Sequence, residues 1–379
     1  MGIESVNFLE GVLTFFLAVL IISLVIKYSS RIGMLDIPNA RSSHVAPTPR
    51  GAGVGIYLAS LFSFLLFYPH IVGEYWSFFL AQFLIFFVGV YDDNREASPK
   101  IKFIVIILSA VLIFFFNDFR IDTLGTWFGY SISLPLWIAL PFTVFAITGF
   151  TNALNLIDGL DGLAGGVSMV IFLAFFYIGY HYGDMFIQVV SFLMIAALVG
   201  FLLFNWHPAA IFMGDSGSLV LGFTIAAVAI RAIEYVSVTS ILFLAALPII
   251  DTIVVMVRRM QRGQSPFMPD KTHLHHKIVM WRKNVDYSVV LLILIQISFS
   301  LIGVYVHDRD DGAIFILFLI ILLLFFAMLD ERVASREEFA LTRWKRKGLL
   351  YLKERFNYNT LIGLLGIVSL FLFLLNTLF

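Results

Sequence analysis

Four groups of polar residues interrupt a strongly apolar sequence. The first is the pair Asp92 and Asp93, which directly follows an apolar run ending in FVGVY. The other three are NALNLIDGLDGLAGG at 152–166, NWHPAAIFMGDSGS at 205–218 and DKTHLHHK at 270–277. Polar and ionisable groups at the edge of lipid are unfavourable unless they bind ions or one another. The four groups are therefore candidates for a common site.

These groups supply acids, amides and imidazoles that suit a hard cation together with a polyanion. Asn155, Asp158 and Asp161 are spaced three residues apart, so a helix would place them on one face. Asp and Asn oxygens suit Mg²⁺ or Mn²⁺, and Mg²⁺ often bridges to phosphates. Basic side chains could then neutralise the remaining phosphate charge. The further candidates are Arg50, Asn205, Asp215, His273, His275 and His276.

Each group also has a simpler interpretation. An acidic pair at a helix end is often only solvated, and Asp215 before a Ser-Gly-Ser run is typical of a helix N-cap. The glycines after Arg50 are explained by close helix packing as well as by phosphate binding. The three histidines could bind a metal, although the segment offers no further soft ligand. Asp251, in LPIIDT, is expected to make a structural hydrogen bond inside the bundle.

The elements that must position these groups are membrane helices. Of the 379 residues 60% are hydrophobic and only 13% are charged, whereas soluble domains carry roughly 25% charged residues. Apolar runs of about 17 to 21 residues, the length that a bilayer requires, recur along the chain. These runs lack the alternation of barrel strands, so the predicted fold is an all-α polytopic membrane helix bundle. The absence of cysteine excludes a disulfide framework and a Cys-ligated metal.

We expect about 11 to 12 transmembrane helices in a single integral membrane catalytic domain covering residues 1–379. The expected spans are 8–27, 52–69, 76–91, 103–117, 134–150, 163–181, 187–204, 217–232, 239–257, 288–306, 312–330 and 358–378. The last belongs to extra C-terminal helices at 331–379. The basic, aromatic part of this region could instead lie along the membrane surface or form a solvated linker.

The distribution of basic residues predicts an N-terminus outside. In that orientation 22 of the 25 Lys and Arg residues fall in the inner loops and three in the outer loops. Positive charge gathers on the cytoplasmic side of membrane proteins. The same orientation places all four polar groups at inner helix ends, so the active site is expected on the cytoplasmic face.

Six segments together resemble the polyprenyl-phosphate N-acetylhexosamine-1-phosphate transferases of glycosyltransferase family 4. They are PTPRGAG, YDDNREASPKIK, NALNLIDGLDGLAGG, NWHPAAIFMGDSGSLVLG, PIIDT and DKTHLHHK. They follow the family's order and span a family-like core at about 36–280. Any one of them is weakly specific, whereas all six in order are highly specific.

The resemblance implies a Mg²⁺-dependent enzyme of a bacterial inner membrane. Such enzymes transfer a sugar-1-phosphate from a UDP-N-acetylhexosamine to undecaprenyl phosphate and release UMP, which initiates a cell-surface polysaccharide. The resemblance implies that Asp92, Asp93, Asp158 and Asp161 are catalytic, with Asp215 and Asp93 near the metal. It further implies substrate binding by Asn155, Asn205, Lys102, Arg50 and the three histidines.

Several alternatives stay open from the sequence. GlcNAc is the expected sugar, with GalNAc, FucNAc or QuiNAc as alternatives, and Mn²⁺ could replace Mg²⁺. The transfer could be direct or pass through a phospho-enzyme. A secondary transporter with twelve spans is the alternative of a different class, but such proteins bind near the bilayer midplane on paired repeats. Membrane lipids are expected partners, nucleic acid is not, and a homodimer is a hypothesis by analogy.

Overall fold

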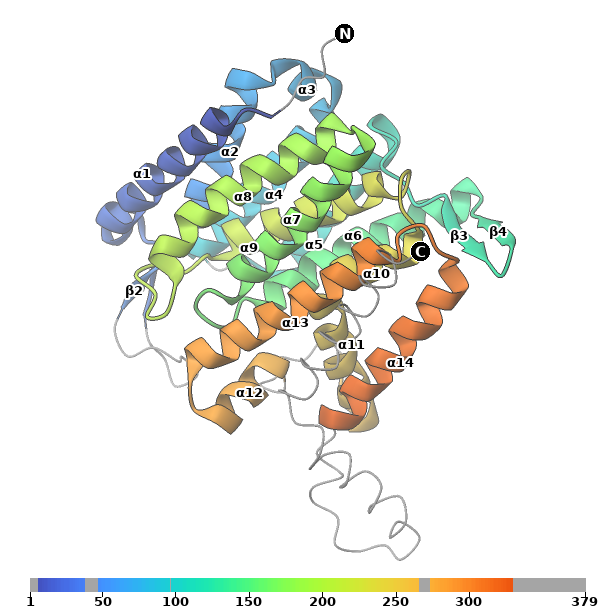
Figure 1. The fold of residues 1–379 in the computed structure, drawn as a ribbon. Helices are drawn as coiled ribbons and strands as arrows, with labels where there is room; N and C mark the ends of the chain where they lie inside the picture. Colours follow the sequence, from blue (N-terminus) through green and yellow to red (C-terminus); the bar gives the residue numbers. More distant parts are fainter. Residues whose placement is uncertain (1–5, 38–46, 96, 266–272, 330–379) are drawn as a thin grey trace, which may run out of the picture.

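Fourteen helices and four short strands make up the computed structural model, which describes residues 6–37, 47–95, 97–265 and 273–329 (Figure 1). The helices are α1 (Phe8–Ile32), α2 (Gly53–Phe67), α3 (Pro69–Glu74), α4 (Trp76–Arg95), α5 (Pro99–Phe116), α6 (Leu136–Ile157), α7 (Leu163–Tyr182), α8 (Met185–Asn205), α9 (Asp215–Ala232), α10 (Val238–Leu244), α11 (Ala246–Gln261), α12 (Leu274–Arg282), α13 (Val285–Tyr305) and α14 (Asp311–Leu329). The strands are β1 (Leu35–Asp36), β2 (Thr48–Pro49), β3 (Thr123–Trp127) and β4 (Tyr130–Ser133).

The prediction of an all-α polytopic membrane bundle is confirmed. Within the described residues, eight helices are long and apolar enough to cross a membrane, or nine if the bent pair α10–α11 counts as one span. The shorter apolar helices α2 and α14 coincide with two more of the expected spans. The expected twelfth span at 358–378, and the rest of 331–379, lie outside the described residues. Which end of the bundle faces the cytoplasm stays a prediction.

The centre of the bundle is α9. Of the 18-residue stretch of α9 that could span a membrane, 89% of the residues are buried, against 28% for the corresponding stretch of α1 at the periphery. It packs against α2, α4, α6 and α7. Its sequence DSGSLVLGFTIAAVAIRA is rich in Gly, Ala and Ser, and small residues let neighbouring helices approach closely within a membrane. The first residues of α9 are consequently held among several helix ends.

The ninth expected span, 239–257, is broken, and the prediction of one continuous helix there is wrong. The chain bends by 87° between α10 and α11. Gln296 of α13 makes the break possible, because its Nε2 donates to the carbonyl of Leu244 at 2.8 Å and its Oε1 accepts from the amide of Leu247 at 3.0 Å. Backbone groups without partners are strongly unfavourable in lipid. The signal for this bend therefore lies in another helix, about 50 residues away.

The helix ends form two sets. We call the set that includes the end of α4 and the start of α9 the site end, and the set that includes the starts of α8 and α14 the far end. At the far end, the carboxylate of Asp311 accepts from the amides of Thr126 in β3 (2.9 Å) and Thr239 in α10 (2.8 Å). These bonds fix the β3–β4 hairpin, which the sequence did not predict, against α10 and α14. Asp184 caps α8 at the same end by accepting from the amide of Ile187 at 2.8 Å. The site end holds the predicted polar groups as far as their residues are described.

Candidate active site

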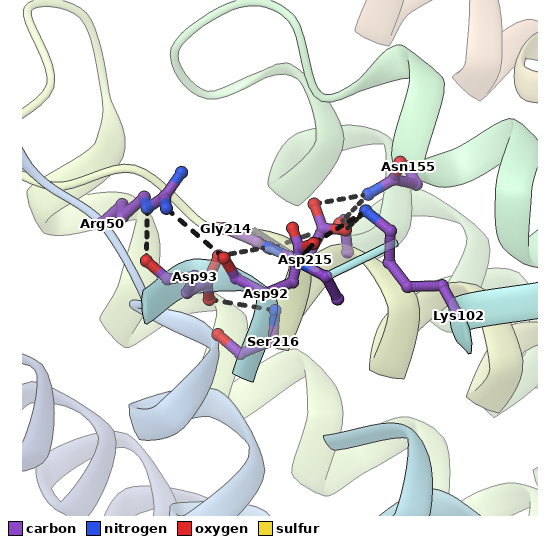
Figure 2. A network of polar contacts seen from close by, with 10 residues as sticks. Arg50, Asp92, Asp93, Lys102, Asn155, Gly214, Asp215 and Ser216 are labelled. Atoms are coloured by element: carbon purple, nitrogen blue, oxygen red, sulfur yellow. Dashed lines mark hydrogen bonds and ion pairs between the residues drawn. The ribbon is translucent and has the colours of Figure 1, made fainter. Parts of the chain in front are cut away.

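The site begins with Asp93, the last buried residue of α4. Its side chain is buried, and its two carboxylate oxygens accept the amides of Asp215 (2.8 Å) and Ser216 (3.1 Å) at the start of α9 (Figure 2). The N-terminus of a helix has unpaired amides and a positive dipole end, so a carboxylate is stabilised there. Gly214 (φ +74°) permits this contact, because a Cβ at this position would lie 2.5 Å from the Asp93 oxygens. Asp93 thus joins the end of α4 to the start of α9.

Lys102 lies between two of the predicted acids. Its Nζ is 2.8 Å from Oδ2 of Asp215 and 3.1 Å from Oδ1 of Asp92 (Figure 2). Asp92 also accepts the amide of Ala97 at 2.8 Å, which fixes the short connection between α4 and α5. One ammonium group therefore balances two partly exposed carboxylates. In an otherwise apolar setting, this grouping leaves negative charge that a bound cation could neutralise.

Asn155, from the last turn of α6, completes the surroundings of Asp215. Its Nδ2 donates to Oδ1 of Asp215 at 3.0 Å and to Oγ of Ser218 at 2.8 Å. Both oxygens of Asp215 therefore have a donor, one from α5 and one from α6. The structure brings Asn155 and Asp215 together, which belong to two of the candidate groups, and adds Lys102, whose contact with substrate was implied by the resemblance and stays a prediction.

Arg50 approaches the same place through its own side chain. Its Nε donates to the main-chain carbonyl of Asp93 at 2.7 Å, and its second nitrogen lies 3.4 Å from the carbonyl of Asp92. A cation at these carbonyls is favourable, because the C-terminal end of a helix carries unpaired carbonyls and partial negative charge. A parallel bridge between Arg50 and Phe212 ties this segment to the loop before α9. In the described structure Arg50 contacts α4, and its predicted contact with substrate stays a prediction.

Within the described part of the chain, Asp92, Asp93 and Asp215 form the group of side chains that could hold a metal ion. One oxygen from each lies within 4.8 Å of the others. Oxygen ligands across an octahedral Mg²⁺ are about 4 Å apart, so small side-chain movements would bring this donor set onto one ion. The donors are all carboxylates, as hard divalent cations prefer. The residues therefore fit Mg²⁺ or Mn²⁺ in both chemistry and spacing.

Asp158 and Asp161 lie in the turn between α6 and α7, beside the acidic group. Burial, followed by the negative charges of Asp215, Asp93 and Asp161, raises the pKa of Asp158 to about 8. Asp161 has local partners, since its Oδ2 lies 2.7 Å from Nδ1 of His207 and 3.1 Å from the amide of Ala209. The two acids of this turn are thus in different environments. Asp158 is surrounded by other negative charges, whereas Asp161 is paired with His207 and an amide.

Asn205 ties two loops of the site together. It is buried, and its Oδ1 accepts the amide of Gly162 at 2.8 Å while its Nδ2 donates to the carbonyl of Ile211 at 2.9 Å. These bonds hold the turn before α7 against the segment that leads into α9. Both polar atoms of the Asn205 side chain are hydrogen-bonded to the main chain of the protein. Its role in substrate binding stays a prediction.

The three histidines differ in their surroundings. His273 is buried and its Nδ1 lies 2.9 Å from Oδ2 of Asp251. His275 is only 1% exposed, and among the described residues neither ring nitrogen has a hydrogen-bond partner. Burial lowers the pKa of His275 to about 3, so this ring is uncharged near neutral pH. The ring of His276 lies 4.2 Å from that of His275.

His275 connects the histidine segment to the acidic turn. A Cβ on Gly159 would lie 2.4 Å from Nε2 of His275, so only glycine allows this approach. The histidines and the acids therefore belong to one contiguous region at the site end. Because His275 is neutral, it would meet a substrate through hydrogen bonding rather than through charge.

Two contributors were not predicted in these roles. Ser218 orients Asn155, and the amides of Asp215 and Ser216 bind Asp93. A capping role for the DSGS sequence was foreseeable, but the capping carboxylate comes from a residue 122 positions earlier in the chain. Asp251 makes the structural hydrogen bond that its sequence suggested, but its partner on the histidine segment was not foreseen.

Comparison with known proteins identifies the family of the chain. The family model described as glycosyl transferase family 4 matches residues 75–233, from the start of α4 to the end of α9. The chain is 30% identical over 312 residues to the "Probable undecaprenyl-phosphate N-acetylglucosaminyl 1-phosphate transferase" of Bacillus subtilis (strain 168), covering 81% of this chain and 87% of the relative.

Two enterobacterial relatives carry the name undecaprenyl-phosphate alpha-N-acetylglucosaminyl 1-phosphate transferase. That of Salmonella typhi is 30% identical over 335 residues, which cover 83% of this chain and 89% of the relative. That of Escherichia coli (strain K12) is 29% identical over 318 residues, which cover 79% and 84%. With its membrane helices and its acidic helix ends arranged as described, this chain belongs to glycosyl transferase family 4.

Proposed function

We propose that the protein transfers GlcNAc-1-phosphate from UDP-GlcNAc to undecaprenyl phosphate and releases UMP. The names of the relatives support the reaction class, the lipid acceptor and the sugar. The observation that carries the proposal is the convergence of Asp92, Asp93 and Asp215 within 4.8 Å, with Lys102 between two of them. Such a group at the ends of membrane helices can receive a soluble diphosphate from one side and a lipid phosphate from the other.

We propose Mg²⁺ as the cofactor, with Mn²⁺ as the alternative. Asp215 is the first choice of ligand, because its side chain is partly exposed and faces Asp92 across Lys102. Asp93 would contribute from the side of α9, where two amides already fix its orientation. When bound, the cation would neutralise charge on the diphosphate and polarise its phosphoryl oxygens.

The reaction we favour is a direct displacement. An oxygen of the lipid phosphate bonds to the β-phosphorus of the sugar nucleotide, the bond from that phosphorus to the bridging oxygen breaks, and UMP leaves. A phosphate monoester is already largely dianionic near pH 7, because its second pKa is about 6. The attacking group therefore needs no strong base, and we assign Asp92 a positioning role. A phospho-enzyme formed on a carboxylate is the competing route.

The other residues of the site would bind and orient the substrates. Lys102 is placed to exchange a carboxylate contact for a phosphate oxygen, since its ammonium already lies within 2.8 Å of Asp215. Asp158 in its neutral form could donate a hydrogen bond, as its pKa is raised to about 8. Asp161 and the histidines border the same region and are assigned to the nucleotide and the sugar diphosphate.

The distribution of basic residues supports an active site on the cytoplasmic face of a bacterial inner membrane. A homodimer stays a hypothesis. Membership of glycosyl transferase family 4 sets the transporter alternative aside, and other UDP-amino sugars stay as alternative donors.

A direct assay tests the reaction. Membranes containing the protein are incubated with UDP-[³H]GlcNAc and undecaprenyl phosphate, and both the lipid product and UMP are quantified. We expect equal amounts of the two products, complete loss with EDTA and recovery with Mg²⁺. The Asp215→Asn variant serves as the matched control for activity from the host membrane. Parallel reactions with UDP-GalNAc and other UDP-amino sugars test the donor, and no product from any of them would refute the proposed reaction.

A further inference from the structure

We propose that Asp251 is a positioning residue that acts through His273, fixing the orientation and the tautomer of this ring at the substrate site. The inference rests on the proposed function, in which the histidine segment borders the sugar nucleotide. It assigns a role to a buried acid that the proposed reaction does not use. Asp251 touches neither the acidic group nor the expected cation, so its effect must pass through another residue.

The contact between the two residues defines the ring. Asp251 is 2% exposed; its Oδ2 lies 2.9 Å from Nδ1 of His273, and its Oδ1 accepts the amide of Leu274 at 2.7 Å. An ionised carboxylate only accepts hydrogen bonds, so Nδ1 must carry a proton. The second nitrogen, Nε2, is then the ring atom left to meet a substrate. A carboxylate that orients a histidine in this way commonly determines which nitrogen does the chemistry.

The ring of His273 is also held from its other side. It stacks on His275 with centroids 5.6 Å apart and an interplanar angle of 18°. His275 in turn abuts Gly159 in the turn that carries Asp158. A rotation of the His273 ring would therefore disturb the packing of His275, and through it the contact of His275 with Gly159. The carboxylate and the stack together favour the observed orientation of the ring.

The position of Asp251 is determined by the helix break. It is the sixth residue of α11, which begins directly after the 87° bend held by Gln296. The buried side of α11 packs against α6, the helix that ends at the acidic turn. Gln296 therefore sets the direction of α11, and α11 brings Asp251 to the histidine segment.

A purely structural role is the alternative, because Asp251 also caps the start of α12 through the amide of Leu274. Asp184 supplies the matched control. It is likewise a buried aspartate that accepts a helix-start amide, from Ile187, and it pairs with a nitrogenous side chain, Arg231 at 2.9 Å. It lies at the far end of the bundle, so its loss reports on structure alone.

The kinetic test uses Asp251→Asn, His273→Gln, the double variant and Asp184→Asn in full-length protein. We expect each single change at the pair to lower kcat/KM for UDP-GlcNAc by about 10- to 100-fold, by analogy with metal-bound histidines, whose rings a carboxylate orients in the same way. The double variant should be no worse than His273→Gln, and KM for undecaprenyl phosphate should not change. Asp251→Glu, which keeps the charge, should retain more activity than Asp251→Asn.

Asp184→Asn should lower the thermal midpoint with unchanged kcat and KM. Losses that multiply in the double variant, or an Asp251→Asn protein with a lower midpoint and unchanged kinetic constants, would overturn the proposal. Asp251→Glu and His273→Gln carry the test if Asp251→Asn does not fold.

An independent readout does not need turnover. In protein labelled with ¹⁵N-histidine, the His273 signals are identified by their loss in His273→Gln. We expect a protonated Nδ1 in the wild type and altered His273 nitrogen shifts in Asp251→Glu and Asp251→Asn, whereas unaltered shifts would refute the coupling. A wild-type protein that makes no lipid product would instead refute the proposed reaction, while the NMR result would still decide whether Asp251 sets the state of His273.

Discussion

Both ends of the bundle bury aspartates, but they compensate them differently. At the far end, Asp184 receives the guanidinium of Arg231, the hydroxyl of Tyr235 and a helix-start amide. Asp311 at the same end accepts donors from two separate segments. Each of these carboxylates is surrounded by the groups that an isolated buried charge requires.

The site end gathers like charges instead of separating them. Asp92, Asp93 and Asp215 approach within 4.8 Å, with the ammonium of Lys102 between two of them, and Asp158 lies beside them with a pKa raised to about 8. Such crowding is unfavourable for folding and favourable for binding a cation. The comparison teaches that the far end is built for stability and the site end for a ligand.

The largest difference between the two ends is expected when one aspartate is changed at each. Asp215→Asn should reduce activity by about 10³-fold or more, on the scale of losing one preorganised electrostatic contact. Its thermal midpoint should not fall, because one of three mutually repelling carboxylates is removed. Asp184→Asn should do the reverse, because the buried ion pair with Arg231 is lost, although Arg231 keeps its more exposed partner Glu234. Turnover assays and thermal unfolding check both, and a stability loss at Asp215 equal to that at Asp184 would contradict the distinction.

Lys102 tests whether the site end has its own compensating charge. Lys102→Met should lower kcat/KM by about 100-fold, since the charge-assisted hydrogen bonds to two carboxylates and the proposed contact with a phosphate are lost. Lys100→Met is the matched control on the same helix, because Lys100 is exposed. The measurement is turnover at saturating Mg²⁺, and equal effects of the two changes would remove Lys102 from the site.

Asp92 should matter less than Asp215 although both belong to the acidic group. Asp92→Asn keeps an oxygen that can accept the amide of Ala97 and loses mainly the charged contact with Lys102. We expect a loss of about 10-fold with activity still measurable, because one charge-assisted hydrogen bond is weakened. Initial rates with both variants decide this, and an equal, total loss in Asp92→Asn and Asp215→Asn would contradict the division of roles.

The smallest effect is a pH dependence of stability without metal. The pKa of Asp158 is raised from its ordinary 3.8 to about 8, so the folded state keeps a proton that the unfolded chain has released. The stabilisation is complete below the ordinary pKa and is lost as pH rises through about 8. In EDTA, the wild type should lose a few degrees of thermal midpoint between these limits, and Asp158→Asn should show a flatter dependence. Asp122→Asn, an exposed far-end acid, should leave the slope unchanged.

Much of the arrangement follows from properties that local sequence carries. Run length and hydropathy identify the spans, because lipid requires about 20 apolar residues per helix. Alternating passage through the membrane then predicts that Asp92, Asn155, Asp215 and His273 share one end. Their contacts agree with this prediction, since Asp215 meets groups from three other segments.

What could not be predicted depends on partners distant in the sequence. Neither Asp93 as the cap of α9 nor Gln296 as the partner of the α10–α11 break has a local signal, because each acts on backbone groups of another helix. The β3–β4 hairpin was missed for a related reason. It is short and only partly buried, and Asp311, from another segment, holds it in place.

The break between α10 and α11 has a consequence for how the protein is made. The carbonyl of Leu244 and the amide of Leu247 find their partner in Gln296, which the ribosome adds about 50 residues later. At about 1.5 Å per residue, neither the 7 residues of α10 nor the 16 of α11 reach across about 30 Å of hydrocarbon alone. We therefore expect this segment to enter the membrane before its final shape can be stabilised, and to reach that shape only after α13 has been inserted.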